Sequence, residues 1–282
     1  MSASISGSAD ILPRGLFANK TVFVTGGGSG INLGIAHSFA RLGAAIAICG
    51  RSQDKLDNAA TALRASGAVV SAVAADVRVP EQLEAAMSAS RETIGDIDVL
   101  ICGAAGNFLS KSESLSPNGF KTIVDIDLVG SFNASRMAFA QLTRTRGSIL
   151  FITAPMAHMA HAFQAHVGPA KAGVEMLMKN LALEWGPYGI RANSIVPGFI
   201  ADTEGMRRIS AQGGGAAFDD YIPLRRMGHV DEIGHAAAFL SSPLAAYITG
   251  TSLWVDGGQA LAGSGFFNAN SATHLENAKP AQ

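Results

Sequence analysis

Short apolar runs alternate with amphipathic helical stretches along most of the chain. Each run has the length and continuous hydrophobicity of a strand that is buried on both faces. After Lys171, apolar residues recur at helical spacing from Val174 to Leu181, and Gly186-Pro187 should end that helix. The alternation predicts an α/β Rossmann fold, a doubly wound, seven-stranded parallel sheet whose ligands bind beyond the carboxyl ends of the strands. The expected strands are 21–25, 45–49, 69–74, 99–102, 148–153, 193–196 and 253–255.

Length and composition favour a single domain with a small-molecule partner. With 282 residues, 48% of them hydrophobic and 15% charged, the chain can bury a large core. A net charge of -1 and the absence of a long basic run argue against binding to nucleic acid or to an anionic membrane. We expect one Rossmann-fold domain over residues 16–261, between a flexible N-terminal tail (1–15) and a C-terminal tail (262–282), both rich in small and polar residues.

Cysteine usage and the chain ends favour a cytoplasmic setting. Cys49 and Cys102 are the only cysteines, too few for a disulfide framework in a domain of this size. The first fifteen residues lack the charged start and apolar centre of a signal peptide, and no apolar stretch approaches the roughly 20 residues that span a bilayer. The final tripeptide, Pro280-Ala281-Gln282, is not a peroxisomal signal.

A glycine-rich segment follows the first expected strand and opens the first helix. From Thr25 to Gly34 it reads TGGGSGINLG. Glycine lets backbone N–H groups approach a pyrophosphate, and the positive end of the helix favours its charge. In this context a dinucleotide site is favoured over a purely structural glycine turn. The predicted cofactor contacts are Thr25, Gly26, Gly28, Ser29, Gly30 and Ile31.

The end of the second expected strand favours NADP(H) over NAD(H). NAD enzymes usually place an acidic residue there for the ribose hydroxyls, whereas this chain has Arg51 and Ser52. The guanidinium fork of Arg51 can pair with a 2′-phosphate, and Ser52 can assist it. The alternative is that Arg51 is an ordinary solvated surface residue.

From about residue 16 to residue 258 the sequence resembles the short-chain dehydrogenase family. Besides the glycine loop, the segments NSIVPG (193–198) and VDGG (255–258) carry this resemblance. It implies further cofactor contacts at Asp76, Val77, Ala105, Gly106, Lys171, Pro197, Gly198 and Ile200. Two places depart from the pattern: Asn32 replaces the last glycine of the loop, and Cys102-Gly103 replace asparagines that are usual in the family. Asparagine tolerates positive φ, so the first departure is compatible with the loop.

The hydroxyl pair of the family's carbonyl reductases is missing. Val167 stands where the family has a tyrosine four residues before the lysine, and Ala154 stands where it has a serine. The neighbouring Thr153 keeps a hydroxyl. A ketone reductase needs an acid that protonates the alkoxide as hydride arrives, and the tyrosine normally supplies it. Because this chain lacks the tyrosine, it either performs different chemistry or performs none.

Several short segments resemble the 2,4-dienoyl-CoA reductases, nearest the peroxisomal type. They are AAGNF (104–108), DID (125–127), QAHVG (164–168), EWGP (184–187) and TEG (203–205). The resemblance implies NADPH-dependent reduction of a 2,4-dienoyl-CoA to a 3-enoyl-CoA, an auxiliary step of fatty-acid β-oxidation. It also implies that Asp127 and Lys171 replace the tyrosine–lysine pair, with Lys171 holding the nicotinamide ribose as well. A structural salt bridge is the alternative role for Asp127.

Reduction of a conjugated thioester suits such a site. Hydride adds to carbon, and hydrogen bonds can hold the resulting enolate until carbon is protonated, so a water proton suffices. Opposite charges about 4 Å apart attract by about 4 kcal/mol at an effective dielectric near 20, which keeps the Asp127–Lys171 pair ionised and able to polarise a trapped water. Asn107 can donate to the thioester oxygen and Phe108 can stack on the dienoyl chain. The alternatives are that Asn107 caps a helix and that Phe108 is a core residue.

Other candidate substrate contacts are weaker. His166 is placed to approach substrate or to supply a proton, and Arg78 is a candidate for coenzyme A phosphates, as are Arg207-Arg208 and Arg225-Arg226, unless these are ordinary surface charges. A small helix is predicted at 203–209. It precedes the run Gly213-Gly214-Gly215, which is either a mobile loop near the site or a plain connector.

No metal site is expected. His158 and His161 have i,i+3 spacing, but no carboxylate or cysteine lies close in sequence to complete a coordination shell.

Three functions remain open. The first is the dienoyl-CoA reductase; the second is a short-chain reductase of another enoyl or carbonyl substrate; the third is a nucleotide-binding scaffold without catalysis. The resemblance also implies a homotetramer that buries the long helices around Asp127 and Lys171.

Overall fold

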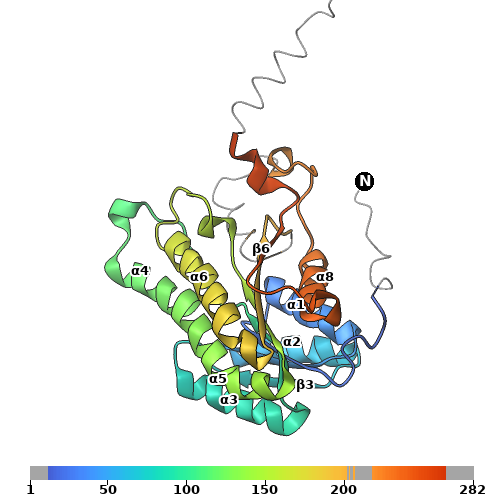
Figure 1. The fold of residues 1–282 in the computed structure, drawn as a ribbon. Coiled ribbons are helices and arrows are strands. Elements are labelled where there is room, and N and C mark those ends of the chain that lie inside the picture. Colours follow the sequence, from blue (N-terminus) through green and yellow to red (C-terminus); the bar gives the residue numbers. More distant parts are fainter. Residues whose placement is uncertain (1–11, 202, 204–205, 207–217, 265–282) are drawn as a thin grey trace, which may run out of the picture.

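The fold is a seven-stranded, wholly parallel sheet with helices on both faces (Figure 1). The computed structural model describes residues 12–201, 203, 206 and 218–264. The strand order is β3-β2-β1-β4-β5-β6-β7, as the alternating pattern predicts for a doubly wound sheet. The strands are β1 Thr21–Thr25, β2 Ala45–Gly50, β3 Val70–Ala74, β4 Ile97–Cys102, β5 Ser148–Ile152, β6 Arg191–Pro197 and β7 Ser252–Val255.

All seven expected strands exist, and only their ends differ from the sequence prediction. β3 begins at Val70, because Val69 is 59% exposed and precedes the ladder. β4 begins two residues before Val99, since Ile97 already pairs with Thr21. Apolar runs locate buried strands well, whereas their ends depend on hydrogen bonds to neighbours far away in sequence.

Two helical layers cover the sheet and define two cores (Figure 1). Successive strand residues face opposite sides, so Val22 and Val24 pack in one core and Phe23 packs in the other. The first layer consists of α1 Gly30–Arg41, α2 Gln53–Ala65 and α8 Val230–Ser241. The second consists of α3 Pro80–Ile94, α5 Gly130–Thr145 and α6 Val167–Trp185. The 3-10 helices are η2 Ser112–Ser114, η4 Pro155–Ala157, η5 Gly186–Tyr188, η6 Phe218–Tyr221, η7 Pro243–Ala245 and η8 Gln259–Ser264.

The helix that was expected to carry Asp127 contains a π-helical turn. α4 Pro117–Val124 runs into the π segment η3 Asp125–Val129, which continues as α5. A π turn widens the helix locally and often occurs at functional sites. The family resemblance placed Asp127 in a long helix but did not predict this turn.

Several sequence predictions fall partly or wholly outside the described residues. They are the tails (1–15 and 262–282), the helix at 203–209, the run Gly213-Gly214-Gly215 and the pair Arg207-Arg208. Within the described part, Leu12 and Leu16 already pack against the core. No described helix is both long and apolar enough to cross a membrane.

Candidate active site

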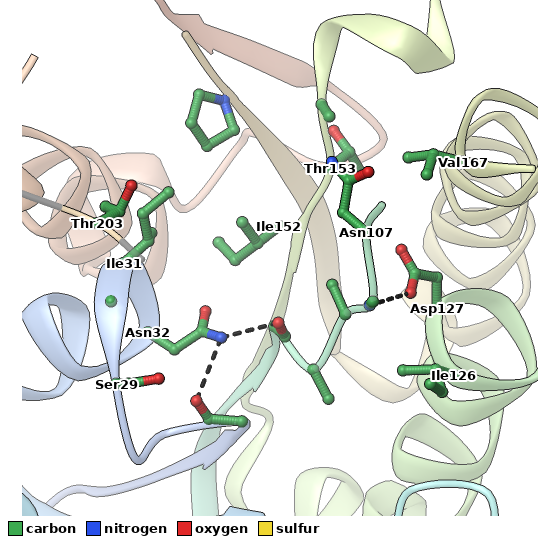
Figure 2. Close-up of a pocket in the computed structure, with 18 of the residues that line it drawn as sticks. Ser29, Ile31, Asn32, Asn107, Ile126, Asp127, Ile152, Thr153, Val167 and Thr203 are labelled. Carbon is green, nitrogen blue, oxygen red and sulfur yellow. Dashed lines mark hydrogen bonds between the residues drawn. The ribbon is translucent and has the colours of Figure 1, made fainter. Parts of the chain in front are cut away.

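A cavity of about 560 Å³ lies at the carboxyl edge of the sheet. Its walls come from the segments that follow β1 to β7, so stretches of chain from all seven strand ends meet there. Strand order changes direction between β1 and β4, the point at which open α/β sheets bind ligands. Figure 2 shows side chains from these segments converging on the same space.

The glycine loop forms the wall after β1. Gly26 has φ 69°, a left-handed conformation that favours glycine. Thr25 Oγ1 accepts hydrogen bonds from Gly103 N at 3.0 Å and Ala104 N at 3.2 Å, joining this loop to the one after β4. At the N-terminus of α1, Ser29 makes no side-chain cap, and the first turn carries no carboxylate. Such a helix end suits a phosphate group.

The loops after β2 and β3 contribute two arginines with different surroundings. Arg51 lines the cavity, is exposed and makes no hydrogen bond or ion pair within the described residues. Ser52 lines the cavity and also caps α2 by accepting from Lys55 N. Arg78 instead pairs with Asp76, at 3.0 Å from Nε to Oδ1 and 2.5 Å from Nη2 to Oδ2. The Arg78 guanidinium thereby holds the pKa of the Asp76 carboxyl below its usual value.

Asp127 and Lys171 meet at the inner wall. Asp127 is fully buried on η3, and its Oδ1 accepts a 2.8 Å hydrogen bond from Gly106 N (Figure 2). Its Oδ2 lies 3.1 Å from Lys171 Nζ. This is the one ion pair of Asp127 within the described chain, and Oδ2 has no hydrogen-bond partner there. Lys171, near the start of α6, also donates to Ile152 O at 3.1 Å. The backbone thus positions both charged groups at the cavity.

The residues that replace the missing tyrosine and serine cannot donate a proton at this wall. Val167 is 2% exposed and lines the cavity, as does Ala154. The Thr153 hydroxyl donates to Glu175 Oε1 at 2.6 Å. A hydroxyl has one hydrogen, so Thr153 does not replace the missing serine as a donor into the cavity.

Glu175 is a buried carboxylate that sequence reasoning missed. It accepts hydrogen bonds from the hydroxyls of Thr153, Ser194 and Ser252. Burial raises its pKa, but these hydrogen bonds outweigh that effect and leave the pKa below the usual value. Its position one helical turn after Lys171 was the available signal, because residues i and i+4 share a helix face. The three hydroxyls come from β6, β7 and the end of β5, and only the fold brings them together.

The segment after β4 presents the predicted substrate contacts. Asn107 lines the cavity and is exposed, whereas Phe108, 42% exposed, and His166 do not line it. The rings of Phe108 and His166 lie 4.2 Å apart between centroids. His166 is fully buried, neither ring nitrogen has a hydrogen-bond partner within the described residues, and burial lowers its pKa. A neutral imidazole is a weak acid, which disfavours His166 as the proton source.

Most predicted site residues line one cavity. Those that do not are Thr25, which lies behind the glycine loop, and Phe108, His166 and Arg78. Lining residues that the sequence did not assign include Asn32, Met156, His161, Thr203, Met206 and Gln259. Gln259 accepts from Phe199 N at 2.9 Å and so holds the turn that contains the predicted residues Pro197, Gly198 and Ile200. A polar residue 60 positions away gave no sequence signal for this contact.

His158, Arg225 and Arg226 each contact another group of the protein. His158 Nε2 lies 3.4 Å from Glu175 Oε1, and no group of three metal-ligating residues occurs within the described ranges. Arg226 pairs with Glu232 at 2.6 Å, and Arg225 donates to Asp220 O at 2.9 Å. Both contacts agree with the surface-charge alternative for these arginines.

The family model described as enoyl-(acyl carrier protein) reductase matches residues 26–260, which is most of the chain. The chain belongs to the short-chain dehydrogenase/reductase family. A member from Saccharomyces cerevisiae, named peroxisomal 2,4-dienoyl-CoA reductase [(3E)-enoyl-CoA-producing], is 43% identical over 247 residues, 86% of this chain and 85% of that protein. A Bacillus subtilis member, named probable 2,4-dienoyl-CoA reductase [(2E)-enoyl-CoA-producing], is 37% identical over 246 residues, 86% of this chain and 97% of that one.

A solved structure of the same family carries a dinucleotide. The gluconate 5-dehydrogenase of Burkholderia cenocepacia, in complex with NADP and tartrate, superposes with a TM-score of 0.82 at 28% identity. The match covers 88% of this chain and 98% of that one. The short-chain dehydrogenase fold expected from the sequence is therefore confirmed.

Proposed function

We propose that this short-chain dehydrogenase reduces 2,4-dienoyl-CoA to 3-enoyl-CoA with NADPH. The observation that carries the proposal is the buried Asp127–Lys171 pair, 3.1 Å apart, on a cavity where Val167 and Ala154 replace the tyrosine and serine of carbonyl reductases. This arrangement suits a substrate whose oxyanion does not need an immediate proton from a phenol. The names of the two relatives support the same substrate class.

The cavity fits an NADP-type dinucleotide. Its glycine loop and the N-terminus of α1 offer backbone N–H groups to a pyrophosphate, and the exposed Arg51 fork, with Ser52 beside it, offers donors to a 2′-phosphate. Asp76 and Val77 line the part expected to hold adenine. When bound, NADPH would supply the hydride that adds to a carbon of the dienoyl chain.

The remaining chemistry is assigned to residues of this chain. Asn107 donates a hydrogen bond to the thioester oxygen, where charge develops as carbon is reduced. Asp127 and Lys171 orient a water molecule that delivers the proton, and Lys171 also binds the nicotinamide ribose. Asp127 keeps its orientation through the hydrogen bond from Gly106 N, so the same carboxylate fixes the start of the Asn107 segment. Phe108, beside the buried ring of His166, provides a flat apolar surface for the acyl chain.

The proposal is tested by NADPH oxidation in the presence of 2,4-hexadienoyl-CoA. We expect turnover by the wild type, and a fall in kcat of about 100-fold or more in Asp127→Asn, the typical loss when a positioned proton-transfer group is removed. Asp125→Asn is the matched control, since Asp125 lies on the same π turn but pairs with the exposed Lys121. Its kcat should stay within about twofold of wild type, because surface ion pairs contribute little.

Fluorescence titration with NADPH and a thermal unfolding midpoint separate lost chemistry from lost fold in Asp127→Asn. Equal turnover in Asp127→Asn and wild type would exclude the proposed role of Asp127. Product analysis by NMR distinguishes a 3-enoyl-CoA from the 2-enoyl-CoA that the name of the Bacillus relative specifies.

Two other functions give different results in the same assay. Turnover with another enoyl or carbonyl compound, but not with dienoyl-CoA, would indicate a different reductase. Tight NADPH binding without turnover on any member of a substrate panel would favour the non-catalytic scaffold. The intact Asp127–Lys171 pair argues against the scaffold, because a buried ion pair is costly to retain without use.

Assembly and compartment are part of the proposal. We expect a homotetramer, supported by exposed apolar side chains on α5 and α6 such as Phe132 and Met176.

We also expect a reducing, cytoplasmic setting, because Cys49 and Cys102 are free and buried, and burial raises the pKa of each thiol to about 12. The Saccharomyces relative is named peroxisomal, so cell fractionation decides between the two compartments.

A further inference from the structure

The Asn32 side chain joins the two loops that form the centre of the cavity wall. Its amide Nδ2 donates to Gly103 O at 2.7 Å and, at a longer 3.4 Å, to Gly26 O (Figure 2). Gly26 belongs to the glycine loop after β1, and Gly103 begins the loop after β4. These loops flank the point where strand order reverses. A single side chain therefore connects the predicted phosphate cradle to the segment that leads to Asn107.

Gly103 leaves the space that Asn32 fills. A Cβ atom added at Gly103 would lie within 2.7 Å of three atoms of the Asn32 side chain, Oδ1, Cγ and Nδ2. Real Cβ atoms do not approach other atoms so closely, so any other residue at position 103 would displace Asn32. The two departures from the family pattern, at positions 32 and 103, thus depend on each other, because the Asn32 side chain fills the space that a side chain at position 103 would need.

The orientation of the Asn32 amide is fixed by its partners. Both neighbours are carbonyl oxygens, which accept hydrogen bonds, so the NH₂ group must face them and the oxygen must point away. Asn32 Oδ1 is buried and has no hydrogen-bond partner within the described residues. In Figure 2 it points toward the space between Ile31 and Ile152, both of which line the cavity. Oδ1 is also the atom nearest the Cβ position of Gly103, so a side chain at position 103 would meet it first.

The loop after β4 is held at both ends of a four-residue span. Gly103 is bound through its carbonyl to Asn32 and through its N–H to Thr25 Oγ1. Gly106, three residues on, donates to Asp127 Oδ1. A shift of the loop at Gly103 would move Gly106 and with it the orientation of the Asp127 carboxylate. Contacts at the cofactor end are thereby linked to the catalytic pair through the backbone.

We propose that Asn32 is a positioning residue that ties the cofactor loop to the loop bearing Gly106 and Asn107, and that Gly103 is required because it makes room for the Asn32 side chain. The effect on turnover rests on the function proposed above, whereas the effect on cofactor binding does not.

A double-mutant cycle tests the dependence between positions 32 and 103. The four proteins are wild type, Gly103→Ala, Asn32→Gly and Asn32→Gly/Gly103→Ala, each titrated with NADPH by fluorescence without substrate. With Asn32 present, Gly103→Ala should weaken NADPH binding by about tenfold or more, as expected when contacting residues are coupled. With Gly at position 32, the same change should cost less than about threefold. The thermal unfolding midpoint should follow the same pattern.

An equal cost of Gly103→Ala in both backgrounds would overturn the proposal. If Gly103→Ala does not fold, the double variant must fold, because the collision has been removed; failure of both would also refute the dependence. These outcomes are measured without an acyl-CoA, so they stay distinct from a failure of the dienoyl-CoA assay. NADH is titrated in parallel, so a different cofactor preference does not hide the result.

Asn32→Ala separates positioning from simple stabilisation, since it removes the amide and causes no clash at Gly103. We expect about tenfold weaker NADPH binding together with a lower kcat, while KM for the acyl-CoA stays within about twofold of wild type. Transferring the amide in Asn32→Gly/Gly103→Asn should restore part of the lost kcat. A lower unfolding midpoint with unchanged NADPH binding and kcat would show that Asn32 only stabilises the fold.

Discussion

At the residue scale, the site depends on which polar atoms are already paired within the protein. Arg51 and Arg78 follow neighbouring strands and carry the same guanidinium group. Arg78 is held by a bidentate bond to Asp76, whereas Arg51 makes no hydrogen bond or ion pair within the described part of the chain. The sequence proposed Arg51 for the cofactor and Arg78 for the substrate, and the structure favours only Arg51 as a free anion-binding group.

Replacing Arg51 should change the cofactor preference. Arg51→Glu removes the proposed partner of a 2′-phosphate and adds a like charge, so kcat/KM with NADPH should fall by about 10- to 100-fold, the effect of losing charged hydrogen bonds. Activity with NADH should stay the same or rise. Arg64→Glu, at the opposite end of α2, makes the same charge change away from the cavity and should alter neither value.

Steady-state rates with each cofactor measure this preference directly. An unchanged ratio of NADPH to NADH activity in Arg51→Glu would mean that Arg51 is only a surface residue.

The residues of the site differ in how far sequence could identify them. Asp127 and Lys171 followed from the resemblance, and the structure places them 3.1 Å apart. The Thr153 hydroxyl was noted as a remnant of the missing pair, yet its proton is bound to Glu175. That contact depends on how α6 packs against the end of β5, which one sequence does not reveal.

At the element scale, α8 begins with a capping box whose carboxylate is strongly acidic. Glu232 accepts from His229 N at 2.8 Å and from Arg226 at 2.6 Å. The hydrogen bond from Arg226 lowers the pKa of Glu232 to about 2, despite the opposing effect of burial. Because the folded pKa lies below the unfolded one, near 4.5, the unfolded state binds more protons in this interval. The stabilisation is complete above about pH 4.5 and is lost as the pH falls toward 2.

Glu232→Gln should therefore lower the free energy of unfolding by about 1 kcal/mol at pH 7, a value typical of a helix cap and reduced by solvent screening. The difference from wild type should shrink as the pH falls from about 5 to 3, as followed by urea unfolding. Glu92→Gln, an exposed glutamate on α3, is the control and should show no such pH dependence. A constant difference across this range would contradict the assigned role of the ion pair.

Helices and strands were predictable where their hydrophobic pattern is regular. All seven strands were found, but the π turn at η3 was not. A π turn needs only one change in hydrogen-bond register, which leaves the spacing of apolar residues almost unaltered.

At the scale of the whole molecule, one helical layer leaves apolar side chains uncovered. Phe132 on α5 is 46% exposed and Met176 on α6 is 57% exposed, although both helices pack on the sheet through their other faces. α4, α5 and α6 lie on the same side of the sheet in Figure 1. Exposed apolar groups on one layer are typical of a subunit interface.

Light scattering coupled to size-exclusion chromatography should give a tetramer for wild type. Phe132→Lys/Met176→Lys should give smaller species, because charges would be buried in the interface. Val69→Lys changes an equally exposed apolar residue just before the edge strand β3 and should leave the mass unaltered. A monomeric wild type at micromolar concentration would refute the assembly.

The sequence by itself determined the parallel sheet, the glycine loop after β1 and, through resemblance, the Asp127–Lys171 pair. These follow from local periodicity and from motifs that lie within a few residues of one another. Only the tertiary structure decided that Asn32 needs Gly103, that Thr153 is bound to Glu175 and that Gln259 holds the turn at Phe199. The physical reason is that space and hydrogen-bond partners are shared between segments far apart in sequence, such as Asn32 and Gly103 at a separation of 71 residues, and only folding brings such segments together.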